Sequence, residues 1–242
     1  VCQEGGIYYI PEMNVGEKRF SGYYYFDESS GVLAEEAGTT PEGLTIQKDG
    51  SIKELTNPGI KNLKKAVKEF TEKLEGDWSV YVKDLKSGEK FSINDKAMSS
   101  ASLIKAFTMA ASYDNMEKIR MVEGMLLKAD PASQTVADKL FRLMENMVTY
   151  SDNESFNEMV RLQTASNQFN AGARVINRYL REQGYKETAV LHTLAPSNTD
   201  SEGLGSSNMT SVEDCGTLLE KIYRRECVSQ EDSEQMLSLL LN

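Results

Sequence analysis

The chain has 242 residues, of which 40% are hydrophobic and 26% are charged, enough to form one large domain or one domain with a small appendage. Its formal net charge of −10 argues against nucleic acid and anionic membrane surfaces as partners, since both bind clustered Lys and Arg. No apolar run approaches the roughly 18 residues of a transmembrane segment. A single histidine, His192, and three cysteines without Cys-x-x-Cys spacing indicate neither a metal site nor a disulfide framework.

Residues 1–57 predict a β-rich N-terminal segment. Gly6–Ile10 and Gly22–Asp27 are short aromatic runs separated by Gly and polar residues, which is typical of hairpin strands and turns. Gly22–Leu33 resembles one unit of the cell-wall-binding repeats of the choline- or glucan-binding type, and Leu44–Ile52 resembles a degenerate second unit. This resemblance implies contact with a cell-wall polymer. A plain β-hairpin appendage is the alternative, because stacked repeats usually need about three units.

Pro58-Gly59 predicts the start of a second domain, residues 58–242. Apolar residues at helical spacing from Ile60 to Leu74 predict an amphipathic helix. Alternating apolar residues from Trp78 onward, with a turn at 86–89, predict a hairpin that ends near Ile93.

The rest of the second domain is predicted to be mainly helical. Residues 102–112 are apolar on every side, which predicts a buried helix. Residues 185–209 read as a loop, and Thr210 with Glu213 forms a capping box for the helix that follows. The other predicted helices span 135–147, 154–162, 173–183 and a last segment that opens at Ser229.

Ser102 and Lys105 form a Ser-x-x-Lys motif on the buried helix. A serine hydroxyl is a weak nucleophile and needs an adjacent base, and a lysine three residues on lies one helical turn away on the same face. Burial lowers the pKa of an ammonium toward the range in which it accepts the serine proton, and the helix N-terminus favours a developing oxyanion. The alternative is an ordinary helix start with a snorkelling lysine.

Ser151-Asp152-Asn153 is a second polar motif, in a predicted loop between two helices. Its functional interpretation has Ser151 passing the proton to the leaving group, Asn153 donating an amide hydrogen bond to the substrate carbonyl, and Asp152 bracing the loop. A simple helix cap is the alternative, because Ser, Asp and Asn are favoured at that position.

In this order and spacing the two motifs resemble the class A β-lactamase and penicillin-binding-protein superfamily, whose signature is Ser-x-x-Lys, Ser-Asp-Asn and Lys-Thr-Gly. The resemblance covers about residues 63–242 and includes Asn157 and the helix entry at 208–214. It implies an α/β fold in which an all-helical half packs on an antiparallel sheet flanked by helices. Because only one hairpin of that sheet precedes Asn242, we expect its remaining strands, and the Lys-Thr-Gly motif, further along the chain.

The resemblance also implies a role for each site residue. Ser102 would be acylated by the substrate carbonyl, with Lys105 as the base, or sharing that role, and Ser151 as the proton relay. Asn153 would position the acyl side chain, and Asp152 and Asn157 would support the site. The resemblance implies no metal and no cofactor.

Class A β-lactamases carry a Glu in a Glu-x-x-x-Asn loop, which activates the water that clears the acyl-enzyme. Residues 186–198 contain no Glu in that setting, since Glu187 comes too early. We therefore expect a serine hydrolase that acts on β-lactams or on D-alanyl peptide bonds of peptidoglycan. The alternatives are a D-Ala-D-Ala carboxypeptidase or esterase without efficient β-lactam hydrolysis, and an inactive cell-wall-binding protein. The sequence starts at Val1, with no initiating Met and no charged-then-apolar leader. This start fits a protein trimmed of its leader, so we expect a secreted or cell-surface protein.

Overall fold

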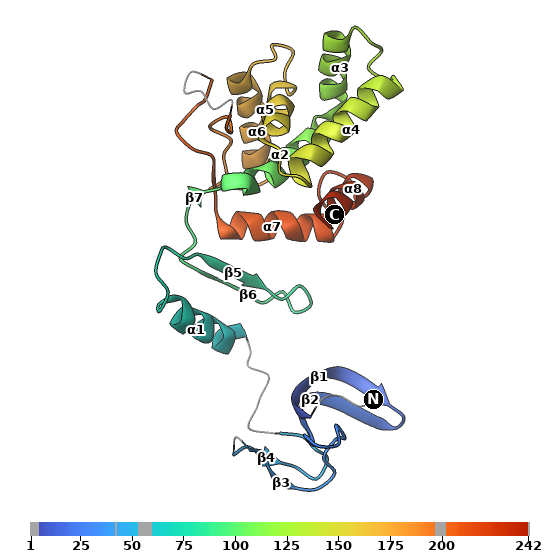
Figure 1. Ribbon diagram of the computed structural model, residues 1–242, viewed down its shortest axis with the longest axis vertical. Coiled ribbons are helices and arrows are strands. Elements are labelled where there is room, and N and C mark those ends of the chain that lie inside the picture. The colour runs from blue at the N-terminus through green and yellow to red at the C-terminus, as the bar shows by residue number, and fades with distance from the viewer. Residues whose placement is uncertain (1–4, 42, 53–59, 197–201, 242) are drawn as a thin grey trace. The chain divides into compact units, whose positions relative to one another are not determined.

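A computed structural model of the chain describes residues 5–41, 43–52, 60–196 and 202–241 (Figure 1). Over these residues the predicted mixed α/β fold is confirmed, with eight α-helices and four two-stranded antiparallel sheets. The chain divides into two compact units, Val1–Glu75 and Gly76–Asn242. The domain boundary predicted at Pro58-Gly59 lies outside the described residues and stays a prediction.

The first unit contains a long hairpin, as the aromatic runs predict. Strand β1 (Gly6–Val15) pairs with β2 (Lys18–Phe26), and β3 (Gly38–Thr39) pairs with β4 (Thr45–Ile46). A small core of Tyr24, Ile46 and Ile52 is buried between them. Helix α1 (Ile60–Thr71) follows in the same unit, where the helical spacing predicts it.

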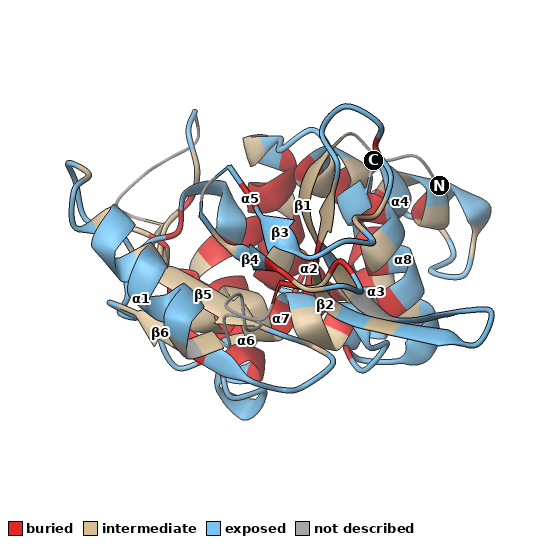
Figure 2. Cartoon of the chain, turned by 90° about the horizontal axis from the view of Figure 1, so that it is seen from below, coloured by how far each residue is buried: buried red, intermediate tan, exposed pale blue. Residues whose placement is uncertain are grey.

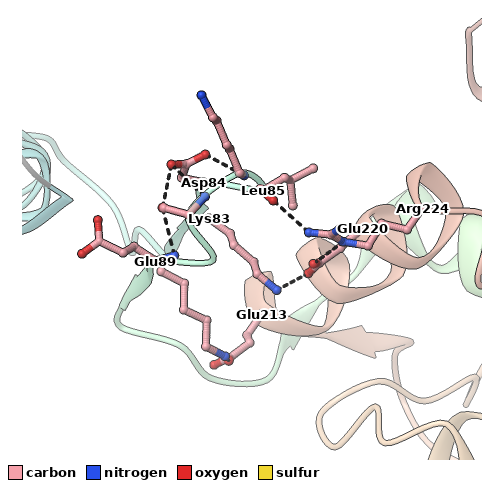
Figure 3. Close-up of polar contacts among 10 residues, drawn as sticks. Lys83, Asp84, Leu85, Glu89, Glu213, Glu220 and Arg224 are labelled. Carbon is pink, nitrogen blue, oxygen red and sulfur yellow. Dashed lines mark hydrogen bonds and ion pairs between the residues drawn. The ribbon is translucent and has the colours of Figure 1, made fainter. Parts of the chain in front are cut away.

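The second unit begins with the predicted hairpin, β5 (Val80–Lys83) and β6 (Lys90–Ile93), which packs on helix α7 (Val212–Tyr223). The contact is close, because a Cβ atom at Gly216 would lie 2.3 Å from the Tyr81 ring. Ion pairs Lys83–Glu220 and Lys90–Glu213 join hairpin and helix, and Arg224 donates to the Leu85 carbonyl at 2.9 Å (Figure 3).

The core of the second unit surrounds helix α2 (Ile104–Asp114), eight of whose residues are buried (Figure 2). A hydrophobic cluster continues from it into the neighbouring helices. These are α3 (Met116–Leu127), α4 (Gln134–Val148), α5 (Asn153–Arg161), α6 (Phe169–Glu182), α7 and α8 (Gln230–Leu241). Within the described ranges, no helix combines the length and apolar character that crossing a membrane requires.

The structure corrects three local predictions. Residues 116–127 form a helix that the sequence pattern did not reveal. Ser102 lies in a 3-10 turn, η1 (Ala101–Leu103), that precedes α2. The cap of α7 is Ser211, whose hydroxyl accepts from the Asp214 N–H, and not Thr210. Thr210 belongs to the short strand β8 (Met209–Thr210), which pairs with β7 (Met98–Ser99), so it is still part of a strand one residue before the cap.

Candidate active site

Ser102 is held in a strained turn between a strand and a buried helix. Strand β7 leads into Ser100, whose N–H donates to the Asn208 carbonyl at 2.9 Å. Ala101 then adopts φ of 44°, a left-handed conformation that is unfavourable for a residue with a side chain. The next residue, Ser102, is exposed at the N-terminal end of α2, where helix N–H groups and the dipole favour negative charge. Strain of this kind concentrates at functional sites.

Lys105 connects this turn to the Ser151-Asp152-Asn153 segment. Its side chain comes from α2, and the residue is only 2% exposed. The Nζ atom lies 3.3 Å from Ser102 Oγ, 3.0 Å from Ser151 Oγ and 2.7 Å from Asn153 Oδ1, and it also donates to the Ser151 carbonyl oxygen. Burial lowers the pKa of Lys105, and the negative charge of Asp152 opposes that shift. A lysine in these surroundings releases its proton more readily than one in water.

Ser151 completes a triangle with Ser102 and Lys105. Its hydroxyl donates to Ser102 Oγ at 3.0 Å and accepts from Lys105 at the same distance. The backbone of Ser151 is also left-handed, with φ of 56°, which lets one residue present both its hydroxyl and its carbonyl oxygen to Lys105. A proton on Ser102 therefore has two routes to the lysine, one direct and one through Ser151.

Asp152 is the N-cap of α5, so the cap interpretation holds for this residue. Its carboxylate accepts from the Ser155 N–H at 2.6 Å. Hydrogen bonds from the side chain and the backbone of Ser155, together with the charge of Lys105, lower the pKa of Asp152. The cap fixes the start of α5, and Ser151 and Asn153 on either side of it reach Lys105. One motif thus supplies both a helix cap and polar groups for the lysine.

Two asparagines of α5 hold residues 194–196 beside the site. Asn153 Nδ2 donates to the Ala195 carbonyl at 2.8 Å. One turn later, Asn157, which is fully buried, both donates to the Leu194 carbonyl and accepts from the Leu194 N–H, each at 2.9 Å. The sequence pointed to the asparagines, but Leu194 and Ala195 were missed because they take part through backbone atoms, which leave no residue-type signal.

An open cavity of about 570 Å³ adjoins Ser151 and Asn153. Its further lining residues are Asn146, Tyr150, Asp152, Glu154, Ala195 and Pro196. Over the described residues, no carboxylate forms a hydrogen bond or ion pair with Ser102, Lys105 or Ser151. Glu187 is positioned elsewhere, since its N–H donates to Asp214 at 2.9 Å. No group of three or more His, Cys, Asp or Glu side chains in the described part of the chain gathers where it could hold a metal ion.

Comparisons with known proteins identify the family and the fold of this chain. Residues 62–242 match the model of a family described as the β-lactamase enzyme family. An ancestral (GNCA) class A β-lactamase is similar in structure, with a TM-score of 0.54 and 17% identity over 74% of this chain and 70% of that one. A halotolerant bacterial β-lactamase has a TM-score of 0.50 and 17% identity, over 73% of this chain and 69% of that one. At these identities the likeness concerns the fold.

A β-lactamase from Sphaerobacter thermophilus is a further similar structure, with a TM-score of 0.48 and 18% identity over 67% of this chain. The chain spans 62% of the length of that enzyme. No curated protein sequence matches the chain.

Replacing Asn157 by Leu is expected to release residues 194–196, because the Leu194 N–H and carbonyl lose their partner. Native-state hydrogen exchange should show the Leu194 amide losing protection by roughly tenfold or more. Asn177→Leu is the matched control, because Asn177 makes the same pair of bonds to Val190 and should expose the Val190 amide alone. If the Leu194 amide keeps its protection in Asn157→Leu, Asn157 is not the residue that holds this segment.

Proposed function

This chain belongs to the β-lactamase enzyme family, and on that premise we propose that it is a serine acyl-enzyme hydrolase acting on β-lactams or on D-alanyl amide and ester bonds of peptidoglycan peptides. One observation supports the proposal above the others. Ser102, Lys105 and Ser151 lie within 3.3 Å of one another in a hydrogen-bonded triangle around a buried lysine. This arrangement pairs a nucleophile with a base, as covalent catalysis requires.

In the proposed acylation step, Ser102 Oγ attacks the substrate carbonyl carbon. Its proton passes to Lys105, directly or through Ser151, and neutral Lys105 is the form that accepts it. The backbone N–H of Ser102 lies where the α2 dipole favours the oxyanion that forms. Ser151 then passes the proton to the departing nitrogen or oxygen, so the serine ester forms as the substrate amide or ester bond breaks.

Asn153 is proposed to hold the acyl carbonyl of the substrate. Its Oδ1 accepts from Lys105, and one of its two amide hydrogens is donated to Ala195. A primary amide has two N–H donors, so the second remains for a substrate. Asn153 thereby links the base, the 194–196 segment and the ligand through a single side chain.

Release of the acyl group is proposed to be slow. Hydrolysis of a serine ester needs a base that activates water, and the described residues around Ser102 hold no carboxylate in hydrogen-bond contact with it. Ala195, whose carbonyl Asn153 binds, brings no acidic side chain to this edge of the site. These observations favour the alternative of a D-Ala-D-Ala carboxypeptidase or esterase with inefficient β-lactam hydrolysis.

A second proposal concerns the first unit. We propose that it binds a cell-wall polymer and that the protein is secreted or lies at the cell surface. Tyr9 and Tyr23 are paired across β1 and β2 with their rings 5.1 Å apart, on the sheet face opposite buried Tyr24. Paired tyrosines offer flat apolar area edged by hydroxyl groups, which suits a sugar ring. An inactive protein on the same scaffold would retain this contact and lack acylation.

A fluorescent penicillin is expected to label the full chain covalently, because Ser102 is exposed and paired with a buried base. Ser102→Ala should reduce labelling by roughly a thousandfold or more, whereas Ser166→Ala, at an exposed serine outside the site, should not change it. Mass spectrometry should detect an adduct that persists while nitrocefin turns over slowly. A missing adduct would rule out the acyl-enzyme, and rapid turnover would contradict slow release.

The acylation rate is expected to rise with pH and then level off below the ordinary lysine pKa. The neutral amine of Lys105 is the active form, and burial lowers its pKa, so the neutral fraction grows at a lower pH than for a lysine in water. Labelling rates between about pH 6 and pH 10 measure this profile. Lys105→Arg should be slow with no plateau, since arginine keeps its proton throughout. A wild-type rate that tracks hydroxide concentration without a plateau argues against Lys105 as base.

Isolated cell walls are expected to sediment the full chain in the Ser102→Ala background, in which the active site cannot form an adduct. The double change Tyr9→Ser and Tyr23→Ser should reduce the bound fraction about tenfold, because it removes the paired rings. Met13→Ser with Val15→Ser, at exposed residues near the hairpin turn, is the matched control. If the parent protein does not sediment, the first unit is a plain hairpin appendage.

A further inference from the structure

Asn208 is a buried side chain that is bonded to the segment leading to Leu194 and Ala195. It is 5% exposed. Its Oδ1 accepts from the Leu191 N–H at 2.7 Å and from the His192 N–H at 2.9 Å, and its Nδ2 donates to the His192 carbonyl at 2.9 Å. One side chain thus makes three hydrogen bonds to backbone groups, and these bonds fix where residue 208 lies.

The backbone of residue 208 holds the turn that carries the proposed nucleophile. The Asn208 carbonyl accepts from the Ser100 N–H at 2.9 Å, and Ser100 is 1% exposed. Ala101, with φ of 44°, follows directly, and Ser102 comes next. The three bonds of the Asn208 side chain therefore place the acceptor that holds the residue just before the left-handed one.

The turn has space into which it could relax. A cavity of about 190 Å³ adjoins Ala101, and its lining includes Ser99, Leu194 and Asn208. A residue with a side chain keeps a left-handed conformation only where its surroundings impose it. Because this cavity leaves room beside Ala101, packing restrains the turn less than the hydrogen bond from Ser100 to Asn208 does.

We propose that Asn208 is a positioning residue for the proposed nucleophile. Its side chain is anchored on Leu191 and His192, and its carbonyl keeps Ala101 left-handed, which keeps Ser102 Oγ 3.3 Å from Lys105 Nζ. The inference rests on the proposed function, because it concerns the nucleophile of the same site. Asn208 acts through the turn, and its role needs no contact with the substrate.

Asn208→Leu should slow covalent labelling of the full chain by a fluorescent penicillin about tenfold, because a displaced nucleophile reacts poorly. Native-state hydrogen exchange should show the Ser100 amide losing protection in the same variant. Asn177→Leu is the matched control, since Asn177 is also buried and also accepts from and donates to one backbone position, Val190. Its labelling rate should stay within about twofold of the wild-type rate, with the Ser100 amide still protected.

A second change separates positioning from a general loss of stability. Glycine adopts a left-handed conformation without steric cost, so in an Ala101→Gly background the turn depends less on Asn208. There, Asn208→Leu should slow labelling by no more than about threefold. If circular dichroism shows that Asn208→Leu is unfolded, Asn208→Asp replaces it, because a carboxylate still accepts from the Leu191 and His192 N–H groups. Its loss should be about threefold, and Ala101→Gly should remove it.

The outcomes separate this inference from the proposed function. Losses of equal size with and without Ala101→Gly, or an equal loss in Asn177→Leu, overturn the positioning role. A Ser100 amide that stays protected in Asn208→Leu overturns it as well. If the unaltered chain forms no adduct, the proposed function fails, whereas the exchange of the Ser100 amide still reports whether Asn208 holds the turn.

Discussion

The site depends on the need to satisfy one buried ammonium. Lys105 projects from the most buried helix of the second unit, and a charge taken out of water is costly unless polar atoms surround it. Those atoms come from Ser151 and Asn153, which lie more than forty residues further along the chain. The packing of α2 against the α4–α5 connection therefore also supplies the hydrogen bonds of Lys105. The same packing positions the proposed nucleophile.

Two left-handed residues flank that lysine, and the surrounding fold keeps them in place. Ala101 and Ser151 each hold a conformation that costs roughly 1–3 kcal/mol. The β7–β8 pairing and the Ser100–Asn208 bond fix the first, while the Asp152 N–H donates to the Asn146 carbonyl at 2.9 Å and fixes the second. With both residues held in this way, the Ser151 hydroxyl donates to Ser102 Oγ at 3.0 Å.

Much of the site could be predicted from the sequence, because its side chains follow local rules. Ser102 and Lys105 meet through helical spacing, and Asp152 caps a helix as its residue type favours. Helix α3 was missed because Met121 and Met125 on its outer side are about 60% exposed, so its apolar residues form no clean stripe. The cap at Ser211 was misplaced by one residue because the pairing of β7 with β8, a contact between distant segments, decides where α7 begins. The partners of Asn153 and Asn157 are backbone groups of a loop that is distant in the sequence. They could not be predicted, because backbone groups are the same in nearly every residue type.

The buried side-chain amide of Asn157 donates to the Leu194 carbonyl and accepts from the Leu194 N–H. A neighbouring β-strand would supply the same pair of hydrogen bonds from its backbone. The segment beside the proposed nucleophile is thus held through main-chain atoms of Leu194 and Ala195, and not through their side chains. The bond that Asn153 donates to residue 195 goes to its carbonyl oxygen, which every residue type has. A scaffold with this property can gain or lose a reactive group next to its nucleophile by single substitutions, so descendants of one fold can differ in the fate of their covalent intermediate without being rebuilt.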